Sequence, residues 1–269
     1  MATTQTYSGI EHLGVGVDGG VLTVTLNRPD SLNSLTAPML DTFAATVERA
    51  ADDAAVRVVV VRGAGRGFSS GAGMSADDQA DPAATGTPAE VLDAANRCIR
   101  AIVALPQPAV AVVQGPAAGV GASLALACDV VLASETAFFM LAFTKIGLMP
   151  DGGASALIAA AVGRIRAMRM ALLAERLPAA EAHQWGLVSA VYPADDFAAE
   201  VDAVIAALVA GPAVALRKTK QAVNAATLTE LEAALEREKI GQLMLLGSND
   251  FREGARAFQE RRAAAFTDS

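Results

Sequence analysis

Aromatic residues are scarce in this chain of 269 residues, in which Phe, Trp and Tyr together make up 4%. The formal net charge at pH 7 is −8, and no run of basic residues offsets it. The scarcity of aromatics predicts a core built from Ala, Val and Leu. The negative charge argues against a general nucleic-acid-binding surface, although a few local basic side chains could still meet the phosphates of an anionic ligand.

Cysteine and histidine are also rare, with two of each. Neither His12 nor His183 has Cys, Asp or Glu at a spacing typical of metal ligands, so we expect structural roles for both and no metal site. Cys98 and Cys128 lie in apolar segments. This predicts buried free thiols in a reducing compartment, and we expect a cytoplasmic protein.

Long uninterrupted apolar runs are missing as well. The first nine residues are polar and lack the basic start and apolar core of a secretory signal. Residues 102–133 are apolar but are interrupted by prolines, Gly115 and Asp129, which favours strand, turn and buried helix over a membrane span. With 53% hydrophobic and 19% charged residues, the composition predicts a globular protein that does not bind membranes.

Strands and helices alternate over roughly the first 155 residues, which predicts an α/β fold whose ligand-binding turns lie at strand ends. Residues 75–88, rich in Ala, Asp, Thr and Pro, predict a mobile surface loop. Beyond residue 155 the pattern becomes mainly helical. Strands are expected over residues 15–17, 21–26, 56–61, 109–113, 130–133 and 188–191. Helices are expected over residues 36–51, 88–105, 122–127, 154–162, 164–173, 179–185, 195–210, 212–225 and 229–246.

Two glycine-rich turns, residues 63–71 and 115–124, each follow a β-branched strand and lead toward a helix-like run. Glycine lets the backbone approach a ligand closely, and the first N–H groups of a helix have no partner within the helix. Two such N–H groups aimed at one point form an oxyanion hole, which stabilises an enolate. The turns therefore predict a site for chemistry next to a carbonyl group.

Six groups of segments, in order along nearly the whole chain, resemble the crotonase family, also called the enoyl-CoA hydratase/isomerase superfamily. They are residues 26–29 with 32–35, 65–71, 115–124 with 127–129, 146–153, 182 with 186–188, and 253–262. The resemblance implies an α/β fold in which ββα units form a spiral. It implies a core over residues 10–195 and a C-terminal helical region over residues 196–269 that covers the active site and builds a homotrimer, often paired into a hexamer. It also implies an acyl-CoA thioester as substrate, so that coenzyme A belongs to the substrate and no separate cofactor is expected.

Carried over from the family, the two oxyanion-hole donors are the backbone N–H groups of Ser70 and Val120. Valine replaces the usual glycine at position 120, which a backbone donor tolerates if its φ and ψ are allowed. The first turn has Gly73 where the family usually has Asp, so Ser75 or Asp77 would have to cap the next helix. Contacts with the substrate or coenzyme A are expected from Arg28, Arg66, Phe68, Gly71, Ala72, Gly73, Gly119 and Phe143.

The two glutamates that hydratases of the family use correspond to Ser123 and Phe143. Water addition needs a base and an acid, and neither side chain supplies them at neutral pH. Asp151, in a Pro-Asp-Gly-Gly sequence, matches the acidic residue of family members that move double bonds, including Δ3,Δ2-enoyl-CoA isomerases and the ring-opening isomerase of phenylacetate breakdown. Spacing alone favours an ordinary turn residue here, whereas the resemblance favours a catalytic one.

One carboxylate suffices for an isomerase, because the same side chain removes a proton and returns it two carbons away. The apolar residues at 138–140 and Phe143 would form a dry wall that raises the pKa of Asp151 toward the range of a general base. The sequence therefore predicts an acyl-CoA isomerase of fatty acid metabolism. Two alternatives stay open: a hydratase or lyase that uses other residues, and a non-catalytic acyl-CoA-binding protein. The Arg-rich segment 252–262, with nearby phenylalanines, predicts a helix for subunit packing or for covering a neighbour's ligand.

Overall fold

The computed structural model describes residues 7–74, 78 and 85–267. Its main sheet has the strand order β1-β2-β3-β4-β6-β9, in which β1 and β2 form an antiparallel hairpin and the other neighbours are parallel. A smaller sheet has the order β5-β7-β8. The main strands are Leu13–Asp18 (β1), Val21–Leu26 (β2), Val58–Gly63 (β3), Ala109–Val113 (β4), Val130–Ser134 (β6) and Ala190–Tyr192 (β9). The smaller strands are Ala117–Ala118 (β5), Phe138–Met140 (β7) and Leu177–Pro178 (β8).

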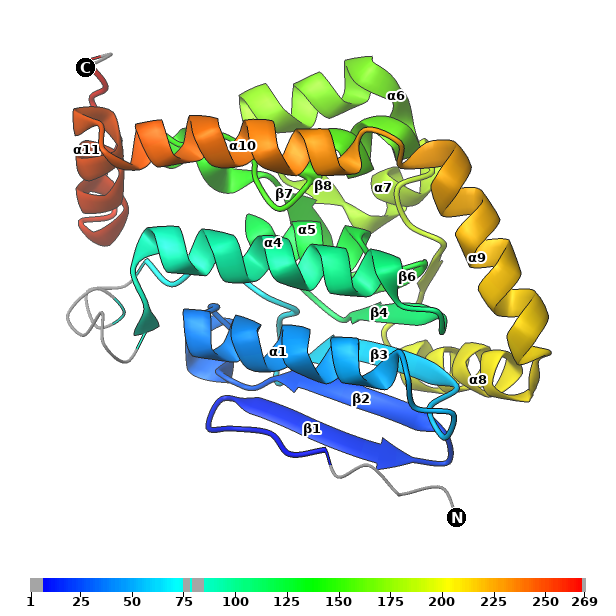
Figure 1. Cartoon of the computed structure of the whole chain (residues 1–269). Coiled ribbons are helices and arrows are strands. Elements are labelled where there is room, and N and C mark those ends of the chain that lie inside the picture. The colour runs from blue at the N-terminus through cyan, green and yellow to red at the C-terminus, as the bar shows by residue number, and fades with distance from the viewer. Residues whose placement is uncertain (1–6, 75–77, 79–84, 268–269) are drawn as a thin grey trace.

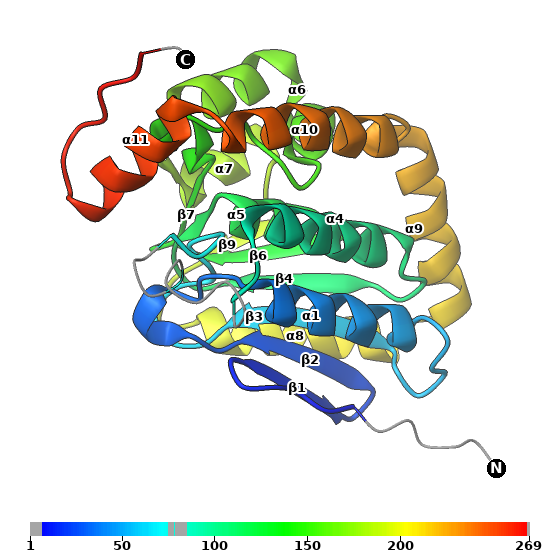
Figure 2. The ribbon, with the colours of Figure 1, turned by 60° about the vertical axis from the view of Figure 1, so that its left-hand side comes forward.

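Helices cover both faces of the main sheet. In Figures 1 and 2, α1 and α4 lie together on one face, and α8 lies on the other. The helix α10 runs beside α4 and α6, and α11 follows it across the end of the molecule. The helices are Ala37–Ala50 (α1), Pro88–Ala104 (α4), Val120–Leu126 (α5), Ala154–Leu173 (α6), Ala179–Trp185 (α7), Phe197–Ala210 (α8), Ala213–Thr227 (α9), Leu231–Leu246 (α10) and Asn249–Gln259 (α11). Short 3-10 helices span Pro29–Ser31 (η1) and Ala142–Ile146 (η2).

The valine run of β3 shows why the central strands are apolar throughout. Val59 and Val61 pack into the larger core with α1 and α4, whereas Val58 and Val60 pack with Phe197 on α8. Successive side chains of a strand point to opposite faces, so a strand covered on both sides needs apolar residues at every position.

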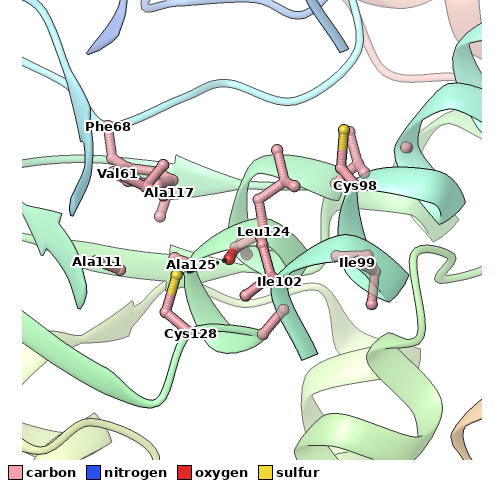
Figure 3. Close-up of a cluster of buried hydrophobic side chains, with 14 of the residues drawn as sticks. Val61, Phe68, Cys98, Ile99, Ile102, Ala111, Ala117, Leu124, Ala125 and Cys128 are labelled. Carbon is pink, nitrogen blue, oxygen red and sulfur yellow. Dashed lines mark hydrogen bonds between the residues drawn. The ribbon is translucent and has the colours of Figure 1, made fainter. Parts of the chain in front are cut away.

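The core beneath the two turns is built mostly from small and branched side chains. Figure 3 shows Val61, Ala111, Ala117 and Leu124 packed with the few larger groups, among them the fully buried ring of Phe68. The thiols of Cys98 and Cys128 are free and buried, and burial raises the pKa of both. The prediction of two buried free thiols is confirmed.

The predicted α/β alternation is confirmed, with shifts at several boundaries. The helix expected from residue 122 begins at Val120, the strand expected over 188–191 is Ala190–Tyr192, and Gly163 breaks α6 with a φ of 77° at the predicted position. The helix expected over 252–262 spans Asn249–Gln259, which leaves Phe266 beyond its end. Most of the loop predicted over residues 75–88, including Ser75 and Asp77, lies outside the described residues. The smaller sheet was not predicted, because strands of two or three residues are too short to show an alternating pattern.

Within the described residues, no single helix is both long and apolar enough to cross a membrane. The helices α8 and α9 pass that test only when taken together, and the chain bends by 105° between them. The division into residues 10–195 and 196–269 stays a prediction. The polar contacts of α9 show how the later helices are attached: the buried Lys220 ammonium lies 2.8 Å from Asp129 and donates to the carbonyls of Ile102 and Gln107.

Candidate functional site

The first glycine turn is held by two amide side chains. Nδ2 of the buried Asn33 donates to the carbonyl oxygens of Ala64, Gly67 and Phe68, at 2.8 to 3.2 Å. Nε2 of Gln114 donates to the carbonyls of Gly63, Gly65 and Gly67, at 2.7 to 3.1 Å. These bonds pair the carbonyl groups of a turn that has no regular secondary structure, and so fix its backbone.

The backbone N–H groups at the end of this turn are mostly used within the protein. Ser70 N–H donates to the carbonyl of Leu32 at 2.8 Å, Gly71 N–H to Ser69 Oγ at 3.1 Å, and Gly73 N–H to the carbonyl of Leu35 at 3.1 Å. The prediction of Ser70 as a donor therefore does not fit the structure, because its N–H already has an acceptor. Ala72 is the residue in this stretch whose N–H makes no hydrogen bond within the described part of the chain.

The second turn brings another free N–H beside the first turn. Val120 is the first residue of α5, and among the described residues its N–H reaches no acceptor. Ser69 and Ala117 form a parallel bridge that places the turns side by side. Gly71 has a φ of 91°, and a Cβ added to it would lie 2.8 Å from the carbonyl oxygen of Ala118 and 3.4 Å from the nitrogen of Val120. Glycine at position 71 thus permits the close approach of the two turns.

Phe143 lies against the second turn from η2. Only 7% of the residue is exposed, and the end of its ring would be 3.9 Å from a Cβ added to Gly119, which has a φ of 53°. Helix α11 packs on η2 through two glycines: a Cβ on Gly254 would lie 2.5 Å from Ile146, and one on Gly147 would lie 2.8 Å from Asp250. The aromatic ring is therefore part of a tightly packed wall next to the turns.

The residues predicted to contact coenzyme A lie in different environments. The guanidinium of Arg28 is turned inward, where it pairs with the buried Asp78 at 2.7 Å and donates to the hydroxyl of Ser34. A Cβ on Gly73 would lie 2.6 Å from the Asp78 carboxyl carbon, so Asp78 fills the space beside the position where the family usually has Asp. Arg66 is exposed at the edge of the first turn. Phe68 is fully buried, its N–H donates to the carbonyl of Pro116 and its carbonyl accepts from Asn33, so the predicted contact of Phe68 with the ligand does not fit the structure.

Asp151 is buried, with 8% of the residue exposed, in the segment that leads into α6. Its Oδ2 accepts a hydrogen bond from Gln242 at 2.7 Å, while its Oδ1 is buried and has no partner among the described residues. Its backbone oxygen accepts from the hydroxyl of Ser123 at 2.8 Å. A Cβ on the next residue, Gly152, would lie 3.3 Å from Cγ2 of Val120. The carboxyl group thus belongs to a segment that contacts the second turn.

Burial raises the pKa of Asp151 to about 7, because the charged form loses its hydration. The hydrogen bond from Gln242 lowers this pKa, and the nearby charge of Glu238 raises it. A carboxyl group with a pKa near neutrality exchanges a proton in either direction at physiological pH, which is the property that a general base or acid needs.

Gln242 and Glu238, both on α10, were not predicted. They lie 91 and 87 residues beyond Asp151 in the chain, and no local motif marks either one. Among the described residues, no group of three or more His, Cys, Asp or Glu side chains is arranged to hold a metal ion. Two backbone N–H groups on adjoining turns have no acceptor within the described residues, and a buried carboxyl group lies on a third segment that contacts the second turn.

Comparison with known proteins agrees with this geometry. Residues 16–269 match the family model described as enoyl-CoA hydratase/isomerase. The chain is 38% identical over 256 residues to "1,2-epoxyphenylacetyl-CoA isomerase" of Escherichia coli, with 93% of this chain and 96% of the relative covered. It is 42% identical over 253 residues to "Probable enoyl-CoA hydratase" of Rhodobacter capsulatus, with the same coverage.

A crystal structure of an enoyl-CoA hydratase from Mycobacterium avium subsp. paratuberculosis is similar along nearly its whole length. It is 67% identical to this chain, with a TM-score of 0.89, and the match covers 96% of this chain and 99% of that one. The names of the relatives include both an isomerase and hydratases. The chain belongs to the enoyl-CoA hydratase/isomerase family, the crotonase superfamily.

Proposed function

We propose that this protein is an acyl-CoA isomerase that moves a double bond, or rearranges a ring, through an enolate. The observation that carries the proposal is the state of Asp151, whose carboxyl group is buried, has a pKa raised to about 7 and keeps one oxygen without a partner among the described residues. A single side chain of this kind serves as both base and acid. The two positions where hydratases carry glutamates hold Ser123 and Phe143, which offer no second acid or base.

In the proposed reaction, the thioester oxygen of the substrate accepts hydrogen bonds from the N–H groups of Ala72 and Val120. The ionised carboxylate of Asp151 removes a proton from the carbon next to the thioester carbonyl of a 3-enoyl-CoA. The electron pair of that C–H bond moves into a dienolate, whose oxyanion the two N–H groups stabilise. Asp151 then returns the proton to the carbon at position 4, which gives the conjugated 2-enoyl-CoA and restores the carboxylate.

The test compares wild-type protein with Asp151→Asn on a 3-enoyl-CoA, followed by the rise in absorbance of the conjugated thioester. We expect the variant to lose at least a hundredfold in kcat, because general acid–base catalysis contributes roughly 10²–10⁴-fold. Wild-type turnover should rise with pH through about 7 as Asp151 loses its proton. The exposed Asp195, changed to Asn, is the matched control and should keep full activity. Full turnover by Asp151→Asn would refute the proposal.

Hydration is the second candidate, favoured by the name of the 67% identical structure. It predicts that the protein consumes a 2-enoyl-CoA and that the absorbance of the conjugated thioester falls. Ser123 is a weak candidate for activating water, since its hydroxyl is fully buried and donates to the carbonyl of Asp151. A third outcome, tight acyl-CoA binding without turnover of either substrate, would indicate a non-catalytic binding protein. A panel of linear and aromatic-ring CoA thioesters separates the three and defines the substrate class.

The protein is also proposed to form a homotrimer or a pair of trimers. Support comes from the apolar side chains that α6, α9 and α10 expose, among them Ile165 at 76%, Val214 at 62% and Met244 at 72%. Exposed apolar surface of this extent is typical of subunit contacts. Sedimentation of the wild-type protein beside Ile165→Asp tests the assembly, and a monomeric wild-type protein would refute it.

A further inference from the structure

Helix α10 touches the segment that carries Asp151 at a buried amide. Gln242, which is 2% exposed, accepts a hydrogen bond from the N–H of Met149 at its Oε1, at 3.1 Å, and donates from its Nε2 to Oδ2 of Asp151, at 2.7 Å. A backbone N–H only donates, so the amide end that faces Met149 must be the oxygen. The end that faces Asp151 is therefore the NH₂ group, and the orientation of the amide is determined.

This orientation distinguishes the two carboxyl oxygens of Asp151. Oδ2 faces a donor whether the acid is neutral or ionised, so it acts as an acceptor in both states. The proton of the neutral acid must then reside on Oδ1, the oxygen that has no partner within the described residues. A proton on Oδ1 is held by no other group among the described residues, so its transfer to a bound molecule would break no hydrogen bond within that part of the protein.

Resting on the isomerase function proposed above, we propose that Gln242 is a positioning residue that makes Oδ1 the proton-carrying oxygen of Asp151. The C-terminal helix α10 thus serves proton transfer in addition to any role in assembly. Gln242 itself touches no reacting atom, because its amide is occupied by Met149 and by Oδ2.

A second set of contacts holds α10 in the position that this role requires. Glu238, one turn before Gln242, accepts from the N–H of Gly153 at 2.7 Å and from the N–H and hydroxyl of Ser155. Gly241 lets the helix come close, since a Cβ there would lie 2.4 Å from Sδ of Met149. Helix α10 therefore binds the chain on both sides of Asp151, at Met149 before it and at Gly153 and Ser155 after it. These contacts hold Gln242 in place.

Among the described residues, few groups face Asp151. From α10 come Gln242 and the carboxyl of Glu238, and from α5 comes the uncharged hydroxyl of Ser123, which binds the Asp151 backbone. Loss of the Gln242 donor removes a bond that favours the ionised form and raises the pKa of Asp151 further. Loss of the Glu238 charge has the opposite effect on that pKa.

The experiment compares Gln242→Leu, similar in size but without a donor, with Glu238→Gln and with the control Glu236→Gln, whose carboxylate on the same helix is exposed. With 3-hexenoyl-CoA as probe, we expect Gln242→Leu to lower kcat by about 10-fold to 100-fold, the range for a hydrogen bond to a charged group, and to leave KM within about twofold. The rise of kcat with pH should move upward by about one unit for Gln242→Leu and downward for Glu238→Gln. Glu236→Gln should match the wild-type protein.

A double variant separates positioning from a general structural role. In an Asp151→Asn background, Gln242→Leu should cause no further loss of kcat, because the proton that it positions is gone. Infrared titration of the Asp151 carboxyl, assigned by its absence in Asp151→Asn, gives the same shift without any substrate. If Gln242→Leu does not fold, Gln242→Met replaces it in every arm.

Unchanged kcat, pH profile and infrared titration in Gln242→Leu would overturn the inference and leave the isomerase proposal intact. An additive loss in the double variant would also overturn it. Full turnover by Asp151→Asn alone would instead refute the isomerase proposal, so the two failures are distinguishable.

Discussion

Replacing Asp151 with Asn should stabilise the protein at alkaline pH while removing the proposed catalytic acid. Burial raises the pKa of Asp151 from an ordinary value of 3.8 to about 7. Between these values the unfolded chain has lost its proton and the folded chain has kept it. The folded state binds more protons, so the free energy of unfolding falls as pH rises from about 4 to about 7 and then levels off.

The size of this effect follows from the shift. About three pKa units at 1.36 kcal/mol each correspond to about 4 kcal/mol of destabilisation at pH 8.5, of which about 1.5 kcal/mol is already present at pH 5. Asn carries no charge and keeps an oxygen that accepts from Gln242. Its new NH₂ group faces the position of Oδ1, where no acceptor lies among the described residues, at a cost of about 1–3 kcal/mol.

The cost of the unpaired NH₂ group is the same at pH 5 and at pH 8.5, so it cancels when the effects of the substitution at the two pH values are subtracted. Relative to wild type, Asp151→Asn should gain about 2.5 kcal/mol in free energy of unfolding between pH 5 and pH 8.5. Urea unfolding of both proteins at the two pH values measures it, and Asp195→Asn serves as the exposed control with no pH-dependent difference. An Asp151→Asn effect that is equal at the two pH values would refute the raised pKa and, with it, the physical basis for a proton shuttle.

Three further predictions concern buried contacts, one at the attachment of α9 and two at the turns of the candidate site. Lys220→Met should lower the free energy of unfolding by about 3 kcal/mol in thermal or urea unfolding, because it leaves the mostly buried Asp129 carboxylate without its cation and two carbonyls without their donor. A loss below about 1 kcal/mol would contradict this. Gly71→Ala should abolish turnover by pushing the two turns apart, whereas Gly16→Ala, where an added Cβ meets nothing within 4 Å, should leave activity unchanged; equal activities would refute the role of the close approach. Ser123→Glu should not create a hydratase, because Ser123 is fully buried and packs closely on Gly152: a Cβ added to Gly152 would lie 3.0 Å from Cβ of Ser123. A soluble variant with hydratase activity would show that the site has more room.

The sequence predicted the parts of the fold that repeat a pattern. The valine strand at residues 58–61 is apparent because a strand covered on both faces is apolar at every position, and the glycine turn after it is apparent because tight turns constrain residue type locally. The strands β5, β7 and β8 were missed, as two or three residues carry too little pattern. The free backbone donor of the first turn was misplaced for a related reason. Ser69 takes the N–H of Gly71 within the turn, but the N–H groups of Ser70 and Gly73 are taken by Leu32 and Leu35, each 38 residues away in the chain, and the sequence of the turn does not reveal these two bonds.

The side chains that tune Asp151 were beyond the reach of sequence reasoning. Pro-Asp-Gly-Gly identifies a turn, and the family resemblance identifies an acid, but burial and the two neighbours on α10 arise only when the chain folds. Glutamine at position 242 is ordinary in a helix and would be read as a solvated residue. Its significance comes from Gly241, which admits α10 close enough to Met149 for the amide to reach the carboxyl group.

The environment of Asp151 places stability and proton transfer in opposition. Complete burial without a donor would raise the pKa above neutrality and keep the acid protonated, so that it could not act as a base. A fully paired carboxylate would keep a low pKa, and both oxygens would be occupied. A single bond from Gln242 avoids both extremes, since it moderates the effect of burial through one oxygen and leaves the other without a partner in the part of the chain that the structure describes. If Asp151 acts as proposed, the residual destabilisation at neutral pH is a direct consequence of keeping the acid reactive.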